Sequence, residues 1–451
     1  MGELNPAGML FVAVAVLLTF MLPRRWAALP LLAGALHMPF GLGVVIGPFN
    51  VYVIRLLLVA ALARLVVRRE GLSGELHALD AAMLVWAVWA VFSAIFHDDV
   101  AAALKFQSGM AFNACACYFV LRVLCPTLDD ARRLCAIAVL LMVPVALEMT
   151  IEQFGAHNLY SVFGDTIDVP QMRFGRLRAQ GPFAHAILAG TVGAVWLPLA
   201  AALWPSHRRI ALVGLAACVV MILASASSGP VLGGLAGAAA LALWPVRQHL
   251  SAVRWSVLAG LLALSAAMSA PVYYLLARID LAGGSTGWYR ARLIESAFEH
   301  INEWWLGGTD VTAHWMPIAL DKTHVDITNE YLHMGVVGGV LLMGLFALIL
   351  VIAFRRVGRT LEQAGTSTQD PRGWFAWALG ASLFAHAVSF MSVSYFDQSF
   401  VALYLTLAAT AAMAVDTATQ PAAREAESDH ASWTGAVPRG ASVALANRTF
   451  N

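Results

Sequence analysis

Six arginines stand in two long stretches, 151–184 and 278–326, that connect apolar runs of the chain. Arginine presents a planar fork of N–H donors that matches phosphate oxygens, and it keeps its charge at physiological pH. The candidate phosphate-binding residues are therefore Arg173, Arg176, Arg178, Arg278, Arg290 and Arg292. In the alternative interpretation they pair with lipid headgroups or with nearby carboxylates, namely Asp165, Asp168, Asp280, Glu295 and Glu299.

Local spacing ranks the arginines of the second stretch. The sequence around Arg290 predicts an amphipathic helix, on which residues three and four apart share a face. Arg292 has Glu295 at this spacing and can be neutralised along the helix, whereas Arg290 has Leu293 and Ile294. Arg290 is therefore the freer cation. Within 286–305, the buried side of the helix is expected to carry Leu293, Ile294, Ala297, Phe298 and Ile301.

Arg178 is the leading candidate of the first stretch. It precedes a Gly181-Pro182-Phe183 turn that leads into an apolar helix, and the turn should hold it near the start of that helix. The positive end of the helix dipole lies there and favours an anion. His185 stands at the same helix start and is expected to help orient an acceptor group.

One further arginine lies within an apolar run. Arg55 stands a few residues inside the third such run, where a charged side chain costs about 2.5–3.5 kcal/mol on insertion scales. Such a residue should face an internal polar cavity. Arg55 therefore joins the expected phosphate-binding set, with a purely structural role as an equal alternative.

Polar residues crowd the end of the second stretch, 321-DKTHVDITNEYLHMGVVGG-339. A histidine or carboxylate at this place can take a proton from an attacking hydroxyl. The catalytic candidates of this kind are His324, Glu330 and His333. Asp326 and Asn329 are expected to orient that hydroxyl.

The structural alternative for this group is helix capping. Asp326 or Thr328 would cap the following helix, and Glu330 and His333 would belong to a buried polar network. No spacing among the histidines and acids is diagnostic of a metal site. The sequence therefore predicts neither a metal nor another cofactor.

The elements that position these residues are expected to be membrane helices. Of the 451 residues, 60% are apolar and 12% are charged, and the mean hydropathy is +0.73. A soluble protein needs more charge to cover its surface, so the composition predicts an all-α polytopic membrane protein with 12–13 transmembrane helices. The apolar runs lie at about 7–22, 28–47, 50–67, 78–96, 106–125, 134–150, 185–204, 209–226, 230–246, 255–277, 327–353, 374–393 and 398–415.

Arginines in every second loop predict the orientation of these helices. Arg24, Arg25, Arg68, Arg69, Arg132, Arg133, Arg208, Arg209, Arg247, Arg254, Arg355, Arg356 and Arg359 mark the cytoplasmic loops. The intervening loops should face outward, at 48–50, 97–105, 151–184, 227–230, 278–326 and 391–397. The arginines that could bind phosphate fall in two of these outward loops, against the charge rule.

The domain organisation is expected to be simple. Residues 1–415 form one transmembrane domain, and the hydrophilic segment 416–451 is expected to be a disordered cytoplasmic tail. The five cysteines lie in apolar segments without metal or redox spacing. No inverted repeat is apparent, which disfavours a transporter.

The order of these parts resembles the O-antigen ligase and O-antigen polymerase superfamily of bacterial envelope glycosyltransferases. Four motifs carry the resemblance, which covers about residues 150–345. They are R-x-x-G-P-F at 178–183, S-x-S-S-G at 225–229, W-W-L-G-G-T-D at 304–310 and T-N-E-Y-L-x-x-G-x-x-G at 328–338.

The resemblance implies a GT-C-like, metal-independent glycosyltransferase of the bacterial inner membrane with its active face in the periplasm. Its donor would be an undecaprenyl-diphosphate-linked glycan. A polymerase passes the glycan to a second lipid-linked glycan, as in exopolysaccharide biosynthesis, and a ligase passes it to the lipid A-core of lipopolysaccharide. A polysaccharide polymerase is slightly favoured here.

The resemblance also implies roles for single residues. By position, Arg178 and either Arg290 or Arg292 match the arginines that hold the diphosphate, and Asn329 matches a family asparagine. Arg176 and Arg55 would assist. The chain departs from the family in two places, since Thr328 stands where a histidine is expected and Ser228 where an arginine is common. Either His324 or His333 then replaces the histidine, or the charge of the arginines suffices.

Two functions of other classes remain as alternatives. A lipid-linked oligosaccharide flippase should keep its cations in a cavity near the middle of the membrane rather than in outward loops. A structural scaffold of an export complex should tolerate removal of the charges.

Overall fold

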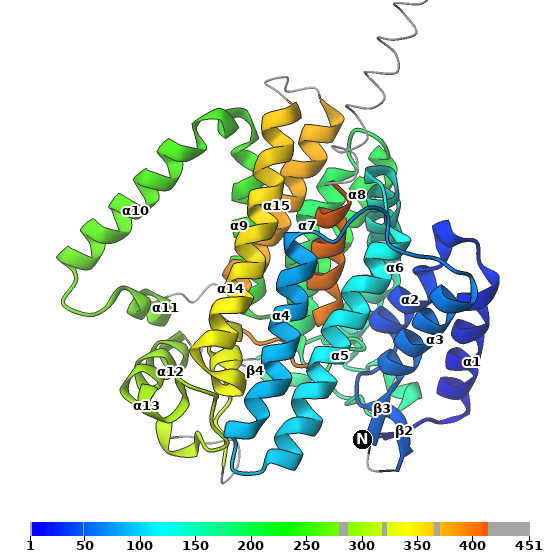
Figure 1. Cartoon of the computed structure of the whole chain (residues 1–451), viewed down its shortest axis with the longest axis horizontal. Coiled ribbons are helices and arrows are strands. Elements are labelled where there is room, and N and C mark those ends of the chain that lie inside the picture. The colour runs from blue at the N-terminus through cyan, green and yellow to red at the C-terminus, as the bar shows by residue number, and fades with distance from the viewer. Residues whose placement is uncertain are drawn as a thin grey trace, which may run out of the picture.

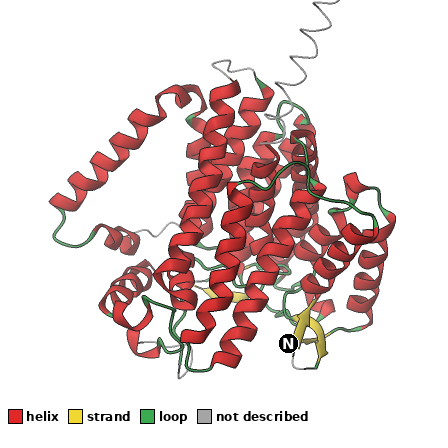
Figure 2. Cartoon of the chain, in the orientation of Figure 1, coloured by secondary structure: helices red, strands yellow, loops and turns green. Residues whose placement is uncertain are grey.

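Helices make up most of the structure, a computed structural model (Figures 1 and 2). It describes residues 2–47, 49–173, 175–278, 287–317, 323–364 and 370–413. The expected tail and Asp280 lie outside the described residues. An all-α architecture is therefore confirmed, with only short strands beside the helices.

Most of the predicted spans coincide with one long helix each. These helices are α1 Pro6–Met21, α3 Val53–Val67, α4 Ala78–Phe92, α5 Val100–Leu124, α6 Leu128–Gly155, α7 Ala186–Ala202, α8 Arg208–Ala224, α9 Ser228–Ala242, α10 Leu250–Ala267, α14 Glu330–Ala364, α15 Pro371–Ser389 and a last helix at Phe400–Met413. Shorter helices join them at α2 Leu29–His37, α11 Leu275–Arg278, α12 Gly287–Glu299 and α13 Ile301–Trp304. The strands are β1 Gly2–Glu3, β2 Leu42–Ile46, β3 Phe49–Tyr52, β4 Gln171–Arg173 and β5 Arg176–Arg178.

The second predicted span, 28–47, is wrong as a continuous helix. α2 ends at His37, and Met38 has extended backbone angles because it precedes Pro39, whose ring disfavours the helical region for the residue before it. The chain then forms β2, which pairs with β3 in an antiparallel hairpin. β1 adds to the other side of β2 in parallel.

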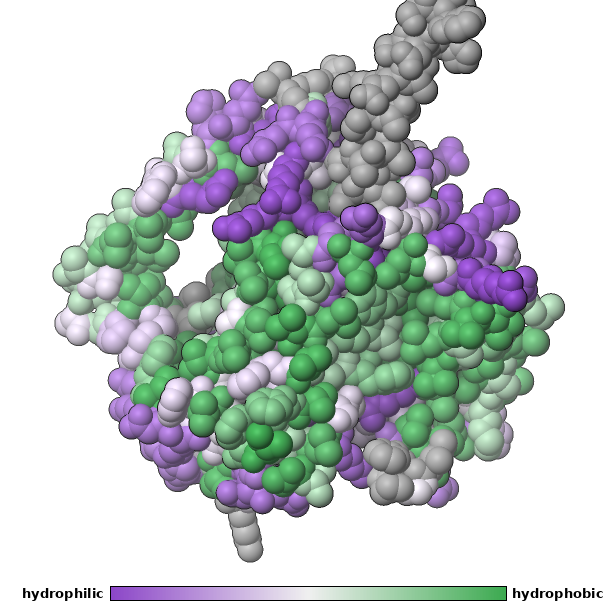
Figure 3. Space-filling model, viewed as in Figure 1, coloured by the Kyte–Doolittle hydropathy of each residue, from purple (hydrophilic) through white to green (hydrophobic). Residues whose placement is uncertain are grey.

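Within the described residues, four helical segments are long and apolar enough to cross a membrane. They are Ala78–Phe96, Leu128–Gly155, Trp244–Ala267 and Glu330–Ala364. Further apolar helices are shorter, among them α1, α7 and α9. In Figure 3 hydrophobic side chains cover the middle of the visible face, and hydrophilic ones gather toward its ends. This distribution suits a protein whose middle contacts lipid.

α14 is broken in its third turn. Gly338 and Gly339 leave the helical region, and Gly339 has φ +77°. The carbonyls that the break releases receive new donors, as buried carbonyls require. The Val337 carbonyl accepts from Gln107 Nε2 at 2.7 Å and from His97 Nε2 at 3.0 Å. The Gly338 carbonyl accepts from Trp89 Nε1 at 2.8 Å.

The segment before α14 forms a small helical unit with its own core. α12 buries Leu293, Ile294 and Ala297, as the amphipathic pattern predicts. The prediction is wrong for Phe298, which is 60% exposed. Trp304 and Trp315 complete this core and hold α12 against α13 and the turn at Ala313–Trp315.

Candidate functional site

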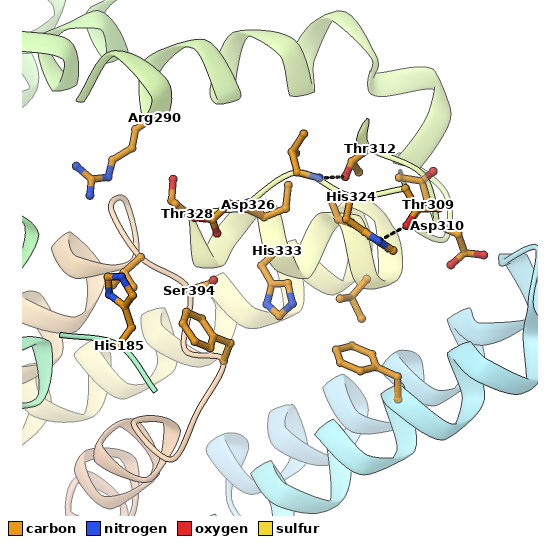
Figure 4. Close-up of a pocket in the computed structure, with 18 of the residues that line it drawn as sticks. His185, Arg290, Thr309, Asp310, Thr312, His324, Asp326, Thr328, His333 and Ser394 are labelled. Carbon is orange, nitrogen blue, oxygen red and sulfur yellow. Dashed lines mark hydrogen bonds between the residues drawn. The ribbon is translucent and has the colours of Figure 1, made fainter. Parts of the chain in front are cut away.

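A cavity of about 1120 Å³ lies at one end of the bundle. Most of its lining comes from five of the six loops that the arginine pattern places on one side, namely 97–105, 151–184, 227–230, 278–326 and 391–397. Loops that lie far apart in the sequence therefore meet here, as alternating spans require. In Figure 4 the side chains of Arg290, His185 and Asp326 approach the same space from different elements.

The β4–β5 hairpin delivers the first arginines. Arg178 ends β5, is buried, and donates from Nη2 to Ser227 Oγ at 2.7 Å. Its Nε is buried without a hydrogen-bond partner. Arg173, on β4, also lines the cavity. Arg176 lies across the hairpin from Arg173, and it is exposed and outside the cavity lining.

α12 separates the two arginines of the second stretch. Arg290 lines the cavity and donates from Nε to the Ser392 carbonyl at 3.0 Å. Arg292 lies outside the lining and pairs with Glu295 at 2.5 Å and with Glu299 at 3.2 Å. The pairing of Arg292 with Glu295 is the one that the spacing predicts.

Two arginines of the cavity lining, Arg178 and Arg290, form no ion pair with a described acid, although Asp98, Asp99, Asp310 and Asp326 also line the cavity. The arginines that form ion pairs among the described residues lie elsewhere, at Arg64, Arg122, Arg132, Arg133 and Arg292. Burial and the charges of Arg173 and Arg178 lower the pKa of Arg290 to about 10, while Asp326 acts in the opposite direction. Burial and Arg173 also lower the pKa of Arg178. Each guanidinium remains charged at neutral pH, so the group attracts an anion.

His185 is neutral at this site. Burial and the two neighbouring arginines, Arg178 and Arg173, lower the pKa of its imidazole to about 4. Its Nδ1 accepts from the Ile187 amide at 3.2 Å and caps α7, so a proton on neutral His185 belongs on Nε2. His185 can therefore donate one hydrogen bond into the cavity.

The polar group before α14 divides into residues that reach the cavity and residues that do not. His324, Asp326, Thr328 and His333 line it. Loss of hydration within the surrounding protein raises the pKa of Asp326, and the positive charge of Arg290 acts to lower it. In Figure 4 His333 projects from α14 into the cavity.

Asn329 and Glu330 lie behind the cavity wall. Asn329 Oδ1 accepts from the Leu332 amide at 3.1 Å, so Asn329 caps α14 in place of the alternatives Asp326 and Thr328. Glu330 Oε2 accepts from the Tyr395 amide at 2.8 Å and lies 3.7 Å from His333 Nδ1. Both residues are buried and outside the lining, where they position their neighbours.

Arg55 lies outside the cavity lining. Its Nε donates to Asn113 Oδ1 at 3.0 Å and its Nη1 to the Asn50 carbonyl at 3.1 Å. Its guanidinium also lies over the Tyr52 ring, 5.3 Å from the centroid. The polar surroundings expected for Arg55 are present, but they are supplied by Asn113 on α5 and by residues of β3 rather than by this cavity.

Sequence reasoning missed a second polar group of the cavity. His97 Nδ1 contacts Asp310 Oδ1 at 2.6 Å, and Gln107 lies beside it with Nε2 at 3.1 Å from His97 Nε2. All three residues line the cavity. Asp310 is the last residue of the W-W-L-G-G-T-D motif, so the sequence contained a signal for Asp310 as a site residue. His97 had none, because its carboxylate partner, Asp310, is more than 200 residues away.

Glu152 holds the turn that carries Arg178. Its Oε2 accepts from the amides of Gln180 at 3.0 Å and of Gly181 at 2.8 Å, and Gly181 has φ +57°. The neighbouring carboxylate, Glu148, accepts from the Leu159 amide at 3.0 Å. The Gly-Pro-Phe turn is thus anchored to α6 rather than to α7.

Glu152→Ala should lower the free energy of unfolding by about 2 kcal/mol, because two buried amides lose their acceptor. Denaturant unfolding of the purified protein in detergent measures this loss. Glu152→Gln keeps a carbonyl oxygen at the same place and should retain most of the stability. Equal losses in the two variants would contradict the anchoring role.

The arrangement joins three arginines with acid–base groups in one cavity. The arginines can hold a phosphate or diphosphate, and the imidazoles and the carboxylate can receive a proton. No known protein-family model matches the chain, and no curated protein is similar to it.

Proposed function

We propose that this protein is a membrane glycosyltransferase that moves a glycan from a polyprenyl diphosphate to a hydroxyl acceptor. One observation carries the proposal. Arg178 and Arg290 are separated by 112 positions in the chain, yet they line one cavity, and neither forms an ion pair with a described acid. A diphosphate would pair with both guanidiniums, and the resemblance to the O-antigen ligase and polymerase superfamily supplies the polyprenyl and glycan parts.

The reaction needs a base for the acceptor hydroxyl on one face of the anomeric carbon and a group that stabilises the leaving diphosphate on the other face. The acceptor oxygen attacks the anomeric carbon, and the bond from that carbon to the diphosphate oxygen breaks with its electron pair on the diphosphate. Arg178 and Arg290 stabilise the charge that develops there. This is an inverting displacement that requires no metal.

His333 takes the proton of the acceptor hydroxyl. Asp326 acts on the pKa of Arg290, so it lies near the end of the cavity that would hold the leaving diphosphate, whereas the base of an inverting displacement acts on the opposite face of the sugar. His333 lines the cavity from α14 and has Glu330 behind it. Its Nδ1 is buried without a hydrogen bond. A small movement would bring His333 Nδ1 within hydrogen-bond distance of Glu330 Oε2, and this hydrogen bond would orient the imidazole.

His333→Ala should lower the transfer rate about 100-fold, at the lower end of the range for base catalysis, since diphosphate is already a good leaving group. Added imidazole should restore part of the rate by occupying the space of the lost ring. Transfer of radiolabelled glycan in membranes measures both effects. His324→Ala is the matched control, and rescue of that variant instead would assign the base to His324.

The proposal places the protein in the bacterial inner membrane with 12 or 13 spans and the cavity on the periplasmic side. The alternating arginines support this orientation. The lipid tail of the donor would lie between helices while its diphosphate enters the cavity. Polymerisation of lipid-linked repeats is the favoured form of the reaction, and ligation to lipid A-core is the other.

Deletion of the gene with analysis of envelope glycans tests the function. A polymerase is indicated if chains shorten to single repeats that remain attached. Accumulation of polymer on the lipid carrier without attachment indicates a ligase. Lipid-linked repeats confined to the cytoplasmic leaflet would refute the enzyme and support a flippase.

A further inference from the structure

Three possible metal ligands meet on the small helical unit before α14. They are His300 at the end of α12, Glu303 on α13 and His314 in the turn at Ala313–Trp315. One ligand atom from each lies within 4.8 Å of the other two. None of the three lines the cavity, so this group is separate from the site described above.

His300 is already oriented for a metal. Its Nδ1 lies 2.8 Å from the Ser296 carbonyl, which can only accept, so Nδ1 carries the proton. Nε2 is then the nitrogen with the free electron pair. A ring N–H bonded to a backbone carbonyl is the usual support of a metal-binding histidine, since it fixes both the tautomer and the ring orientation.

Glu303 has a comparable support. Trp315 Nε1 donates to Glu303 Oε2 at 3.0 Å, and His314 Nε2 lies 2.9 Å from the same oxygen. Burial acts to raise the pKa of Glu303, but these hydrogen bonds outweigh burial and keep that pKa below its usual range. The carboxylate is therefore ionised at neutral pH.

The surrounding packing holds the three ligands in place. The Trp315 ring stacks on His300 with centroids 5.8 Å apart, and His314 meets His300 edge-on at 5.0 Å. Trp304 and Trp315 are almost fully buried in the core of the unit. Glu303 and His314 are themselves exposed at the surface, so an ion can enter from solvent.

We propose that His300, Glu303 and His314 bind a divalent zinc ion. Two histidines and one glutamate form a common three-ligand zinc set, and water completes the tetrahedron. Bonds of about 2.0–2.1 Å place tetrahedral ligands about 3.4 Å apart, so a pair of ligand atoms at the 4.8 Å limit closes by about 1.4 Å on binding. Magnesium and calcium prefer all-oxygen ligands and suit this site poorly.

The ion would act as a clamp. It joins the end of α12, which carries Arg290, to the turn that follows Thr312, a residue of the cavity lining. Binding replaces the hydrogen bond between His314 and Glu303 by two metal bonds and releases any proton on the bound nitrogen. The metal takes no part in the transfer reaction, and the site does not depend on the proposed function.

Metal analysis of the full-length protein in detergent tests the site. After incubation with micromolar Zn²⁺ and gel filtration, on the order of one ion per chain should remain bound. Zn²⁺ should also raise the melting temperature, because it binds only the folded state. Co²⁺ in its place should give the intense visible absorption of a tetrahedral site.

Variants locate the ion. His300→Ala, Glu303→Gln and His314→Ala should each lose the bound zinc, the Zn²⁺-dependent melting shift and the Co²⁺ absorption. Glu303→Gln keeps an acceptor for Trp315, so its fold should persist. The matched control is His157→Ala, which removes an exposed histidine paired with Asp168 and should change nothing. Zinc content equal in Glu303→Gln and the unmodified chain would overturn the proposal.

Discussion

Replacement of Arg290 by alanine should lower the rate of glycan transfer on the order of 10³-fold, the usual effect of removing one preorganised donor to a developing oxyanion. Arg290 is half-buried, holds only the Ser392 carbonyl through Nε, and has its remaining donors on the cavity side. Its charge is therefore available to a diphosphate without breaking an ion pair. The measurement is transfer of radiolabelled glycan from a polyprenyl diphosphate in membranes.

Arg292 supplies the control on the same helix. It lies two positions along α12 and is already paired with Glu295 and Glu299, so Arg292→Ala should retain nearly full activity. Arg290→Lys keeps the charge but loses the planar fork, and it should fall between the two. Arg178→Ala should match Arg290→Ala. Intact transfer in both alanine variants would refute the site.

Gly339→Ala should lower the free energy of unfolding by about 3 kcal/mol, through backbone strain and overpacking together. Gly339 has φ +77° and ψ −179°, a region that essentially only glycine occupies. A Cβ atom there would lie 2.4 Å from the Leu306 carbonyl oxygen. Neither the strain nor the clash can relax without moving the 304–310 segment. Thermal and denaturant unfolding in detergent measure the loss.

Gly344 provides the matched comparison five residues along the same helix. A Cβ atom at Gly344 meets nothing within 4 Å. Gly344→Ala should therefore be neutral or stabilise the helix by up to about 1 kcal/mol. Equal stability of the two variants would show that the break in α14 does not require glycine.

Periodicity and spacing predicted most of the architecture, because helix positions depend on local apolar runs. The different surroundings of Arg290 and Arg292 could also be predicted, since the neutralising Glu295 is one helical turn away. The second span could not be predicted from its composition. Its apolar residues continue into a hairpin, where Pro39 rather than hydropathy decides.

Contacts between distant segments were beyond local reasoning. Arg55 finds Asn113 on another helix, and His97 finds Asp310 across more than 200 residues. The assignment of Asn329 had the same difficulty, since nothing local distinguishes the helix-capping residue among three polar neighbours. That Arg178 and Arg290 share a cavity follows only from the packing of the whole bundle.

The break in α14 has a consequence for how the protein opens. The carbonyls freed around Gly338 accept from Trp89 and Gln107, and the Val336 carbonyl accepts from the Thr309 amide at 2.9 Å. Three segments are thus fastened to one short piece of helix by buried hydrogen bonds. The backbone amide protons of these three segments should exchange with solvent together, as a single cooperative unit. This end of the cavity consequently unfolds and refolds as one unit, while the remainder of the bundle stays folded.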